Sequence, residues 1–184
     1  MKARQRKPWL PLGGKPVIYR TLEIFRNLPW IQEIILVVNE ADEEQANNEL
    51  WDELSGRGVS MVVAGGANRV ESVWNGIEVS DPSSEVIAVH DAVRPFISDD
   101  TCRALMRTAR DRGAAVPVVP MQDTVKRIEG DRVTETVRRL GLMAVQTPQC
   151  FRRQLLIDAY EHARRTETIM ENITDDASLV EAYG

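Results

Sequence analysis

Several short segments of the chain carry side chains of the kinds that bind phosphates, nucleosides or divalent cations. The most concentrated is His90-Asp-Ala-Val-Arg-Pro95, which directly follows the apolar run Val86–Val89. In an open α/β sheet, ligands bind beyond the carboxyl ends of the strands. The carboxylate of Asp91 can hold a divalent cation or a ribose hydroxyl, and the guanidinium of Arg94 can bind a phosphate with two hydrogen bonds. Composition alone slightly favours a simpler role, in which the two side chains pair and fix the loop.

A second segment has the sequence Ala-Gly-Gly-Ala-Asn-Arg-Val-Glu-Ser over residues 64–72. The glycines at 65 and 66 allow the backbone to approach a base or a phosphate closely, and Arg69 and Ser72 fall near the positive end of the helix that we expect next. The commoner explanation of an isolated Gly-Gly pair is a strand-to-helix turn that needs a positive φ.

Two further segments offer hydroxyl groups to phosphate oxygens: Gln146-Thr-Pro-Gln149 and Thr174-Asp-Asp-Ala-Ser178. Thr147 is also explained by a turn before Pro148, and Thr174 by an N-cap of the last helix. Function and capping are compatible at Thr174.

The N-terminal run is basic, with lysine or arginine at positions 2, 4, 6 and 7 ahead of Pro8 and Trp9. A flexible cationic loop can close over a polyphosphate. A basic terminal run is more often simply solvated, and it can also be an arm for nucleic acid. We find no regularly spaced aromatic residues to support the nucleic-acid alternative.

The elements that must position these residues alternate between strands and helices. Four continuously apolar runs, at 34–38, 60–63, 86–89 and 114–119, are typical of strands covered on both faces. Amphipathic stretches at 16–28, 42–54 and from Ser98 to about Arg110 predict helices, with Ser98 as an N-cap and Cys102, Leu105, Met106 and Ala109 as a buried stripe. The order predicts an α/β fold with a mostly parallel, Rossmann-like sheet flanked by helices.

One segment breaks this alternation. Residues 124–128 and 132–137 flank the turn Glu129-Gly-Asp131 and predict a β-hairpin. An isolated hairpin is marginally stable, so we expect it to pack on something, such as a second copy of the protein.

Composition excludes several classes of protein. The chain has 184 residues, a net charge of −5 and two cysteines, Cys102 and Cys150. It lacks the run of about 18 apolar residues that a membrane span needs, and its charge argues against coating nucleic acid. Two cysteines do not make a disulfide framework, which suits the cytoplasm. No zinc-ligand spacing and no nucleophile–histidine pattern appears, so hydrolysis has no support.

Taken together and in order, these segments resemble one family, 2-C-methyl-D-erythritol 4-phosphate cytidylyltransferase of isoprenoid precursor biosynthesis. The resemblance runs over nearly the whole chain, and its specificity lies in the ordered set. The matching segments are Leu10-Pro-Leu-Gly-Gly-Lys-Pro-Val17, Gly65-Gly66 with Arg69 and Ser72, His90-Asp-Ala-Val-Arg-Pro95, Asp123-Thr-Val-Lys126, Thr136-Val-Arg-Arg139, Gln146-Thr-Pro-Gln149 and Thr174-Asp-Asp-Ala177.

The resemblance implies transfer of CMP from CTP to a polyol phosphate with release of pyrophosphate, aided by Mg²⁺. It implies a fold like that of nucleotide-diphospho-sugar transferases, and a homodimer formed through a hairpin arm at 122–144. The resemblance also implies roles for single residues. Lys7, which would bind the triphosphate, and Arg139 are implied to be catalytic, and Asp91 to bind the metal ion. The implied nucleotide-binding residues are Gly65, Gly66, Arg69, Ser72 and Asp91, and the implied acceptor-binding residues are Arg94, Thr124, Arg139, Thr147 and Thr174.

The family's glycine-rich loop after its first strand has no counterpart here, and the family's closing lysine segment lies beyond Gly184. We therefore expect residues 1–184 to form one nucleotidyltransferase domain that is truncated at both ends and lacks the first strand. Two alternatives stay open. One is a sister activity on ribitol 5-phosphate or another pentitol phosphate, and the other is a non-catalytic remnant that dimerises.

Overall fold

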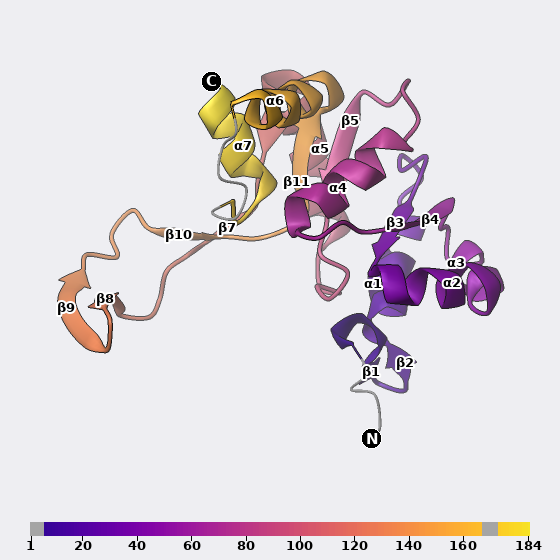
Figure 1. The fold of residues 1–184 in the computed structure, drawn as a ribbon, viewed down its shortest axis with the longest axis horizontal. Helices are drawn as coiled ribbons and strands as arrows, with labels where there is room; N and C mark the ends of the chain where they lie inside the picture. Colours follow the sequence, from indigo (N-terminus) through magenta and orange to yellow (C-terminus); the bar gives the residue numbers. More distant parts are fainter. Residues whose placement is uncertain (1–5, 167–172) are drawn as a thin grey trace.

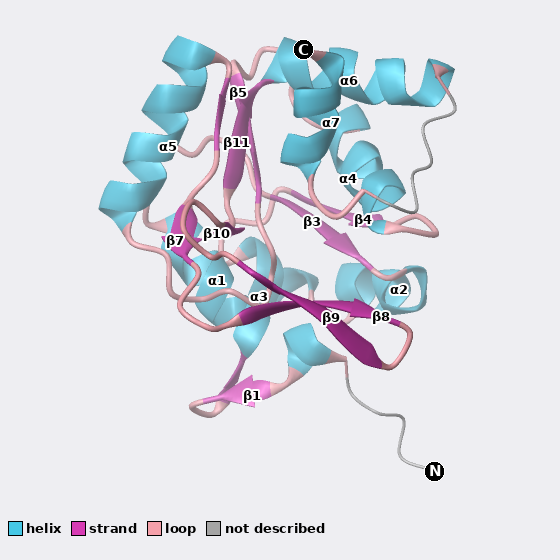
Figure 2. Cartoon of the chain, turned by 90° about the vertical axis from the view of Figure 1, so that its left-hand side faces the viewer, coloured by secondary structure: helices cyan, strands magenta, loops and turns pink. Residues whose placement is uncertain are grey.

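Helices surround two small sheets, and a long hairpin projects away from them (Figures 1 and 2). The computed structural model describes residues 6–166 and 173–184. The first half of the chain forms η1 (a 3-10 helix, Lys7–Trp9), β1 (Pro11–Leu12), β2 (Lys15–Pro16), α1 (Val17–Arg26), β3 (Ile35–Val38), α2 (Glu40–Asn48), α3 (Trp51–Ser55), β4 (Met61–Ala64), α4 (Arg69–Glu78) and β5 (Val86–Val89).

The second half contributes the remaining elements of the body and the whole of the projecting hairpin. They are α5 (Asp99–Arg112), β6 (Ala114–Ala115), β7 (Val118–Pro120), β8 (Val125–Glu129), β9 (Arg132–Val137), β10 (Met143–Val145), β11 (Gln149–Arg152), α6 (Arg153–Arg165) and α7 (Asp176–Tyr183). In the described part of the chain, no helix is long and apolar enough to cross a membrane.

The first sheet is the parallel pair β3 and β4, with Leu36 opposite Val62 and Val38 opposite Ala64. Its buried side chains pack against α1 and against Ala46 and Leu54, the fully buried residues of α2 and α3. The acidic stretch that we predicted as one helix at 42–54 is two helices, which end and begin around Glu49 and Leu50.

The second sheet has the order β5-β11-β6, and both of its pairings are antiparallel. The α/β architecture is confirmed, but the pairing that we predicted as mostly parallel is mixed. The reason is β11, which enters the sheet between β5 and β6 from the opposite direction. Phe151 of β11 and Leu156 and Tyr160 of α6 are fully buried there, under α4 and α7.

The predicted strand at 114–119 is divided between two partners. Ala114–Ala115 pairs with β11, whereas Val118–Pro120 pairs with β10 at the base of the projecting hairpin. Pro117 lies between them and has no backbone N–H to donate to a ladder. The chain therefore changes partner at this point.

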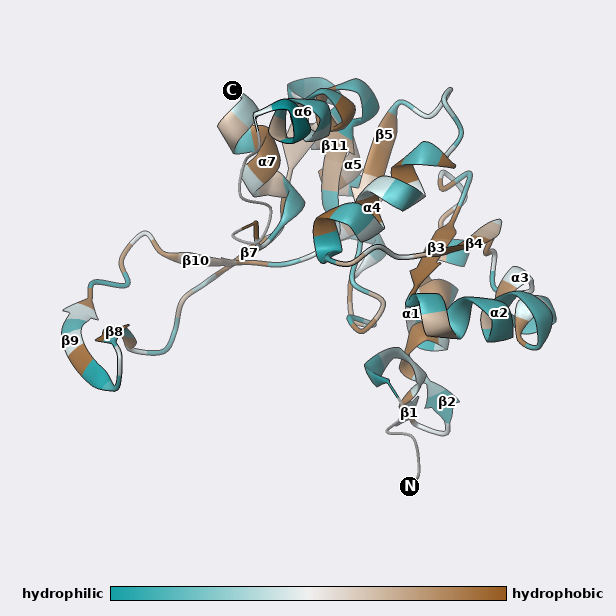
Figure 3. Ribbon diagram, in the orientation of Figure 1, coloured by the Kyte–Doolittle hydropathy of each residue, from teal (hydrophilic) through white to brown (hydrophobic). Residues whose placement is uncertain are grey.

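The hairpin predicted around Gly130 is present as β8 and β9, paired from Val125↔Val137 to Glu129↔Arg132. Gly130 has a φ of +61°, which the absence of a Cβ permits. Figure 1 shows this arm extending well away from the body, and Figure 3 shows apolar positions along it. Ile128 and Val133 are each 61% exposed.

The helix starts follow from local capping. Ser98 accepts a hydrogen bond from the amide of Thr101, as predicted, and Cys102, Leu105 and Ala109 of α5 are buried. The cap of α7 differs from the prediction: Asp175, not Thr174, accepts from the amide of Ser178. Thr174 lies one residue before the cap.

Both cysteines are buried and unpaired in the structure, and burial raises the pKa of Cys102 to about 11 and that of Cys150 to about 12. Because only the thiolate reacts quickly, we expect both thiols to resist a thiol-specific reagent at about pH 8 in the native protein. They should react together when denaturant unfolds the chain. Rapid labelling of either thiol without denaturant would contradict the packing of α5 against β11.

Candidate active site

A cleft of about 1120 Å³ lies between the two sheets and carries most of the nucleotide-binding candidates on its walls. Among the residues that the structure describes, β3 pairs only with β4 and β5 only with β11, and both β3 and β5 line the cleft. Helices α1, α4 and α5 also contribute to its walls. The candidates that line it are Gly65, Gly66, Arg69, Ser72 and Asp91, with His90 beside Asp91.

The two-glycine loop between β4 and α4 is folded tightly against the start of the helix. The amide of Gly66 donates to the Ser72 hydroxyl at 3.1 Å, and that hydroxyl donates to the carbonyl of Asn68 at 2.8 Å. A Cβ on Gly66 would lie 2.3 Å from the Cβ of Glu71, and one on Gly65 would lie 2.7 Å from the Ser72 oxygen. Neither glycine has a positive φ. They are needed for close approach, and the left-handed turn that we considered is not formed.

The carboxyl end of β5 and the start of β11 meet in one hydrogen-bonded cluster. The amide of Asp91 donates to the Thr147 hydroxyl at 3.2 Å, and Nδ1 of His90 lies 3.1 Å from the same hydroxyl. Nε2 of His90 lies 3.0 Å from the carbonyl oxygen of Arg94, which can only accept. His90 therefore carries its proton on Nε2, and its Nδ1 accepts from Thr147. Burial lowers the pKa of His90 and keeps the ring neutral.

Arg94 does pair with Asp91, as the simpler interpretation supposed: its Nε donates to Oδ2 of Asp91 at 2.7 Å. Its Nη1 also donates to the side-chain oxygen of Gln146. The pair is partly exposed, with side-chain exposures of 42% and 36%, so it remains open to a ligand. The two interpretations of this motif are therefore compatible.

Arg69 at the start of α4 contacts the start of the last helix. Its Nη2 donates to Oδ2 of Asp176 at 2.6 Å. Asp176 in turn contacts Gln149 and Tyr160. Gln149 and Asp176 lie inside the recognised motifs, but neither was predicted to have a role, because the importance of these two side chains depends on their burial, which a motif does not show.

Other candidates lie apart from this cluster. Lys7 is exposed in η1 beside α1, and Thr174 is exposed before α7. Thr124, directly before β8, and Arg139, two residues after β9, are exposed, and Arg139 donates to the carbonyl of Gln122. Of the N-terminal basic run, Lys2 and Arg4 lie outside the described residues.

The residues present fit a divalent cation only in part. Among the described residues, no group of three histidine, cysteine, aspartate or glutamate side chains is arranged to hold a metal ion. Mg²⁺ commonly uses one or two carboxylates and takes its remaining ligands from phosphates and water. Asp91 supplies a carboxylate of that kind at the cleft.

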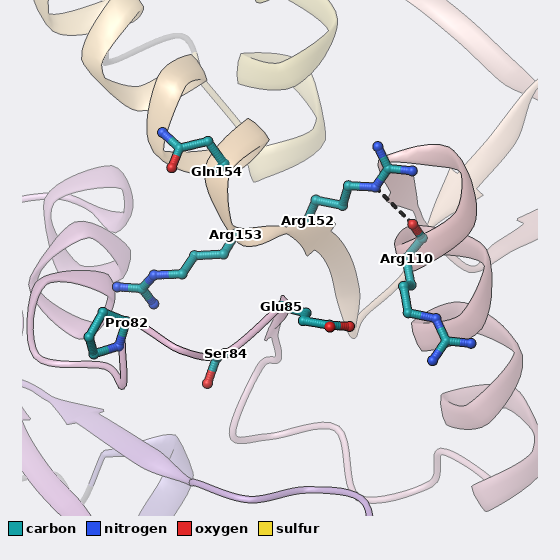
Figure 4. Close-up of a pocket in the computed structure, with 7 residues that line it drawn as sticks. All are labelled: Pro82, Ser84, Glu85, Arg110, Arg152, Arg153 and Gln154. Carbon is teal, nitrogen blue, oxygen red and sulfur yellow. Dashed lines mark hydrogen bonds between the residues drawn. The ribbon is translucent and has the colours of Figure 1, made fainter.

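A smaller cavity of about 400 Å³ lies between α5, α6 and the loop before β5, and it shares Ser84, Glu85 and Arg110 with the wall of the cleft (Figure 4). It is lined by three arginines, but their guanidinium groups point apart. Arg152 donates to the carbonyls of Arg110 and Asp111, and Arg153 donates to Ser80. Arg152 and Arg153 therefore join the start of α6 to its neighbours, Arg110 pairs with Asp111, and the three side chains do not form an anion site.

Comparisons with known proteins give one consistent result. A family model described as 2-C-methyl-D-erythritol 4-phosphate cytidylyltransferase matches residues 1–184. The protein of that name from Bacillus velezensis is 44% identical over 181 residues, covering 98% of this chain and 76% of that protein. The one from Alkaliphilus metalliredigens is 42% identical, covering 97% of this chain and 73% of that protein.

Solved structures agree with these relatives. The 4-diphosphocytidyl-2C-methyl-D-erythritol synthase of Anaerococcus prevotii has a TM-score of 0.82 at 32% identity, covering 97% of this chain and 76% of that one. The 2-C-methyl-D-erythritol 4-phosphate cytidylyltransferase of Thermus thermophilus has a TM-score of 0.79 at 34% identity, covering 96% and 78%.

The lowered pKa of His90 makes stability depend on pH. In the unfolded chain, His90 takes up a proton near the ordinary histidine pKa of about 6.5, whereas in the folded protein its pKa is lower. Because the unfolded state then binds more protons, the free energy of unfolding must fall as the pH decreases below about 6.5. We expect His90→Gln to reduce the fall measured by urea denaturation between about pH 7.5 and 5.5. His162→Gln, which leaves His90 in place, should keep it. Equal pH profiles for the wild type and His90→Gln would contradict the assigned neutral ring.

Proposed function

This chain belongs to the 2-C-methyl-D-erythritol 4-phosphate cytidylyltransferase family, and from that premise we propose which of its residues carry out each part of the reaction. The enzyme is a nucleotidyltransferase of isoprenoid precursor biosynthesis. A phosphate oxygen of 2-C-methyl-D-erythritol 4-phosphate bonds to the α-phosphorus of CTP, the bond from that phosphorus to the β-phosphate oxygen breaks, and pyrophosphate leaves. The pentitol phosphate alternative is not favoured, because the relatives bear the name of the methylerythritol phosphate enzyme.

We propose that the cleft binds the nucleotide. The observation that carries this assignment is that Asp91, Arg69 and the two-glycine loop line the same cleft. The two glycines let the loop lie close against the start of α4, where a Cβ on either would meet Ser72 or Glu71, and Ser72 orders that backbone through Gly66. Arg69 brings positive charge to the same wall.

The reaction depends more on electrostatic stabilisation of the phosphate charges than on a general base. The second pKa of a phosphate monoester is about 6, so the acceptor is already an anionic nucleophile at neutral pH. The barrier comes from repulsion between anions and from charge that develops as pyrophosphate leaves. In this proposal Lys7 contributes its ammonium to the triphosphate. Asp91 holds Mg²⁺, which when bound neutralises phosphate charge.

We further propose that the acceptor is held by residues from two subunits. Arg94, Thr147 and Thr174 belong to the body, whereas Thr124 and Arg139 flank the β8–β9 ribbon of an arm that extends away from it. Arginine guanidinium groups and the hydroxyls of Thr124 and Thr174 can donate to the oxygens of a phosphate, whereas the single hydroxyl proton of Thr147 is already donated to His90. A homodimer whose arms exchange would cover exposed apolar residues such as Ile128, Val133 and Leu140. The two free thiols support a cytoplasmic location.

Turnover is the direct test. We expect the purified chain, with Mg²⁺ and CTP, to release pyrophosphate with 2-C-methyl-D-erythritol 4-phosphate and much more slowly with ribitol 5-phosphate. Asp91→Asn should lower kcat by about 100-fold or more, as removal of one electrostatic stabiliser commonly does. Asp158→Asn removes a carboxylate from α6 outside the cleft and should keep the wild-type rate. Preference for ribitol 5-phosphate, or no turnover with either acceptor, would contradict the assignment.

Mixed dimers test the shared site. Subunits carrying Asp91→Asn and subunits carrying Arg139→Ala should each be inactive alone, because each dimer lacks one group at both sites. Co-expression with two different tags gives mixed dimers in which one of two sites has both native side chains. A random mixture should therefore recover about one quarter of the wild-type activity. A mixture as inactive as its parents would show that Arg139 serves its own subunit.

A further inference from the structure

The most deeply buried charge among the described residues of the site is the carboxylate of Asp176, which has no solvent exposure. A buried carboxylate is tolerated only when it is paired and hydrogen-bonded. Oδ2 accepts from Nη2 of Arg69 at 2.6 Å, and Oδ1 accepts from the Tyr160 hydroxyl at 2.5 Å. Both oxygens are therefore engaged, one by α4 and the other by α6.

Each partner is itself fixed. Burial and the neighbouring Asp176 raise the pKa of Tyr160, so its hydroxyl keeps its proton and donates it. The ring of Tyr160 stacks on Trp74 of α4, with centroids 5.6 Å apart. Burial lowers the pKa of Arg69 and the bond to Asp176 raises it, with a net rise, so the guanidinium is charged.

Gln149, the first residue of β11, connects the contacts around Asp176 to the second sheet. Its side-chain oxygen accepts from the amides of Asp176 and Ala177, at 3.0 and 3.1 Å. Its amide nitrogen donates to Oδ2 of Asp175 at 2.8 Å. The start of α7, the first residue of β11 and the first residue of α4 are therefore held together by buried polar contacts. Each of the three lies in a segment of the proposed site.

One atom of this network is unsatisfied. Arg69 lines the cleft, yet its Nη1 is buried and has no hydrogen-bond partner within the described residues. A buried donor without a partner is costly, and such groups call for a specific explanation. A ligand oxygen bound in the cleft would be the missing hydrogen-bond partner of Nη1.

We propose that Asp176 is a positioning residue for the nucleotide site: it holds Arg69 by one guanidinium nitrogen so that the other meets an oxygen of the bound nucleotide. Asp176 lies two residues after Thr174, so a ligand that orders the Thr174 segment also orders Arg69. The network thereby couples the acceptor end of the site to the nucleotide end. This inference rests on the proposed function, since it takes the cleft to be the CTP site.

The test measures binding of a non-hydrolysable CTP analogue by calorimetry, with Mg²⁺, for the full chain. We expect Asp176→Asn to weaken binding by about tenfold or more, the usual effect of losing a hydrogen bond to a charged group. Tyr160→Phe removes a single hydroxyl, keeps the aromatic packing and should weaken binding less. Asp158→Asn and Tyr183→Phe are the matched controls on α6 and α7, and both should bind as the wild type does.

A double-mutant cycle separates positioning from a merely structural role. If Asp176 acts through Arg69, then Asp176→Asn should add little to the loss already caused by Arg69→Ala. Losses that multiply in the double variant would overturn the proposal, because Asp176 would then act independently of Arg69. If Asp176→Asn does not fold, the cycle is made with Tyr160→Phe, for which the same two outcomes hold.

Coupling gives a second readout. The wild type should bind the CTP analogue more tightly when 2-C-methyl-D-erythritol 4-phosphate is present, by a factor of about 5 or more. Asp176→Asn should bring that factor close to one, and an unchanged factor would contradict the coupling. A wild type that binds no CTP analogue at all would instead remove the proposed function, so the two failures are distinguishable.

Discussion

The antiparallel addition of β11 beside β5 is the constraint on which the site depends. Its register places Gln149 opposite Val89. The start of β11 must therefore lie beside the carboxyl end of β5. Thr147 then meets His90 and Asp91, and Gln149 faces the start of α7. A shift of this pairing by one residue would turn the side chains of β11 to the opposite face and separate these motifs.

Electrostatics explains why the polar groups of the site are so closely paired before any ligand binds. The chain carries a net charge of −5, and the reaction brings together two phosphorylated substrates. A partly exposed arginine directs its N–H groups at a phosphate only if its guanidinium is held in place. Asp91 holds Arg94 and Asp176 holds Arg69, each through one carboxylate oxygen. The pairing reduces the local positive charge, and in return it fixes the direction in which the remaining N–H groups point.

The sequence predicted local features well and pairings poorly. Val86–Val89 was predicted as a strand with the observed bounds, and Ser98 was predicted as a cap, because apolar runs and capping depend on neighbouring residues. The family was recognised for the same reason, since its motifs are local. The insertion of β11 between β5 and β6 depends on contacts between residues about 60 positions apart on one side and about 35 on the other, and periodicity carries no information about such contacts. The role of Asp176 was missed because Thr-Asp-Asp-Ala-Ser reads as a helix cap, and only the fold shows which aspartate is buried.

The separation of the acceptor residues has a physical consequence for the assembly that we propose. Thr124 and Arg139 flank the β8–β9 ribbon of a projecting arm that buries little of its own surface, with Val133, Ile128 and Leu140 more than half exposed. A two-stranded ribbon of this kind gains little from isolated folding. Contact with a second subunit would bury those side chains, and it would also bring Arg139 to a body that already presents Arg94 and Thr147 beside Asp91. The same contact would thus stabilise the arm and complete the acceptor site, which makes catalysis and dimerisation two effects of one interface.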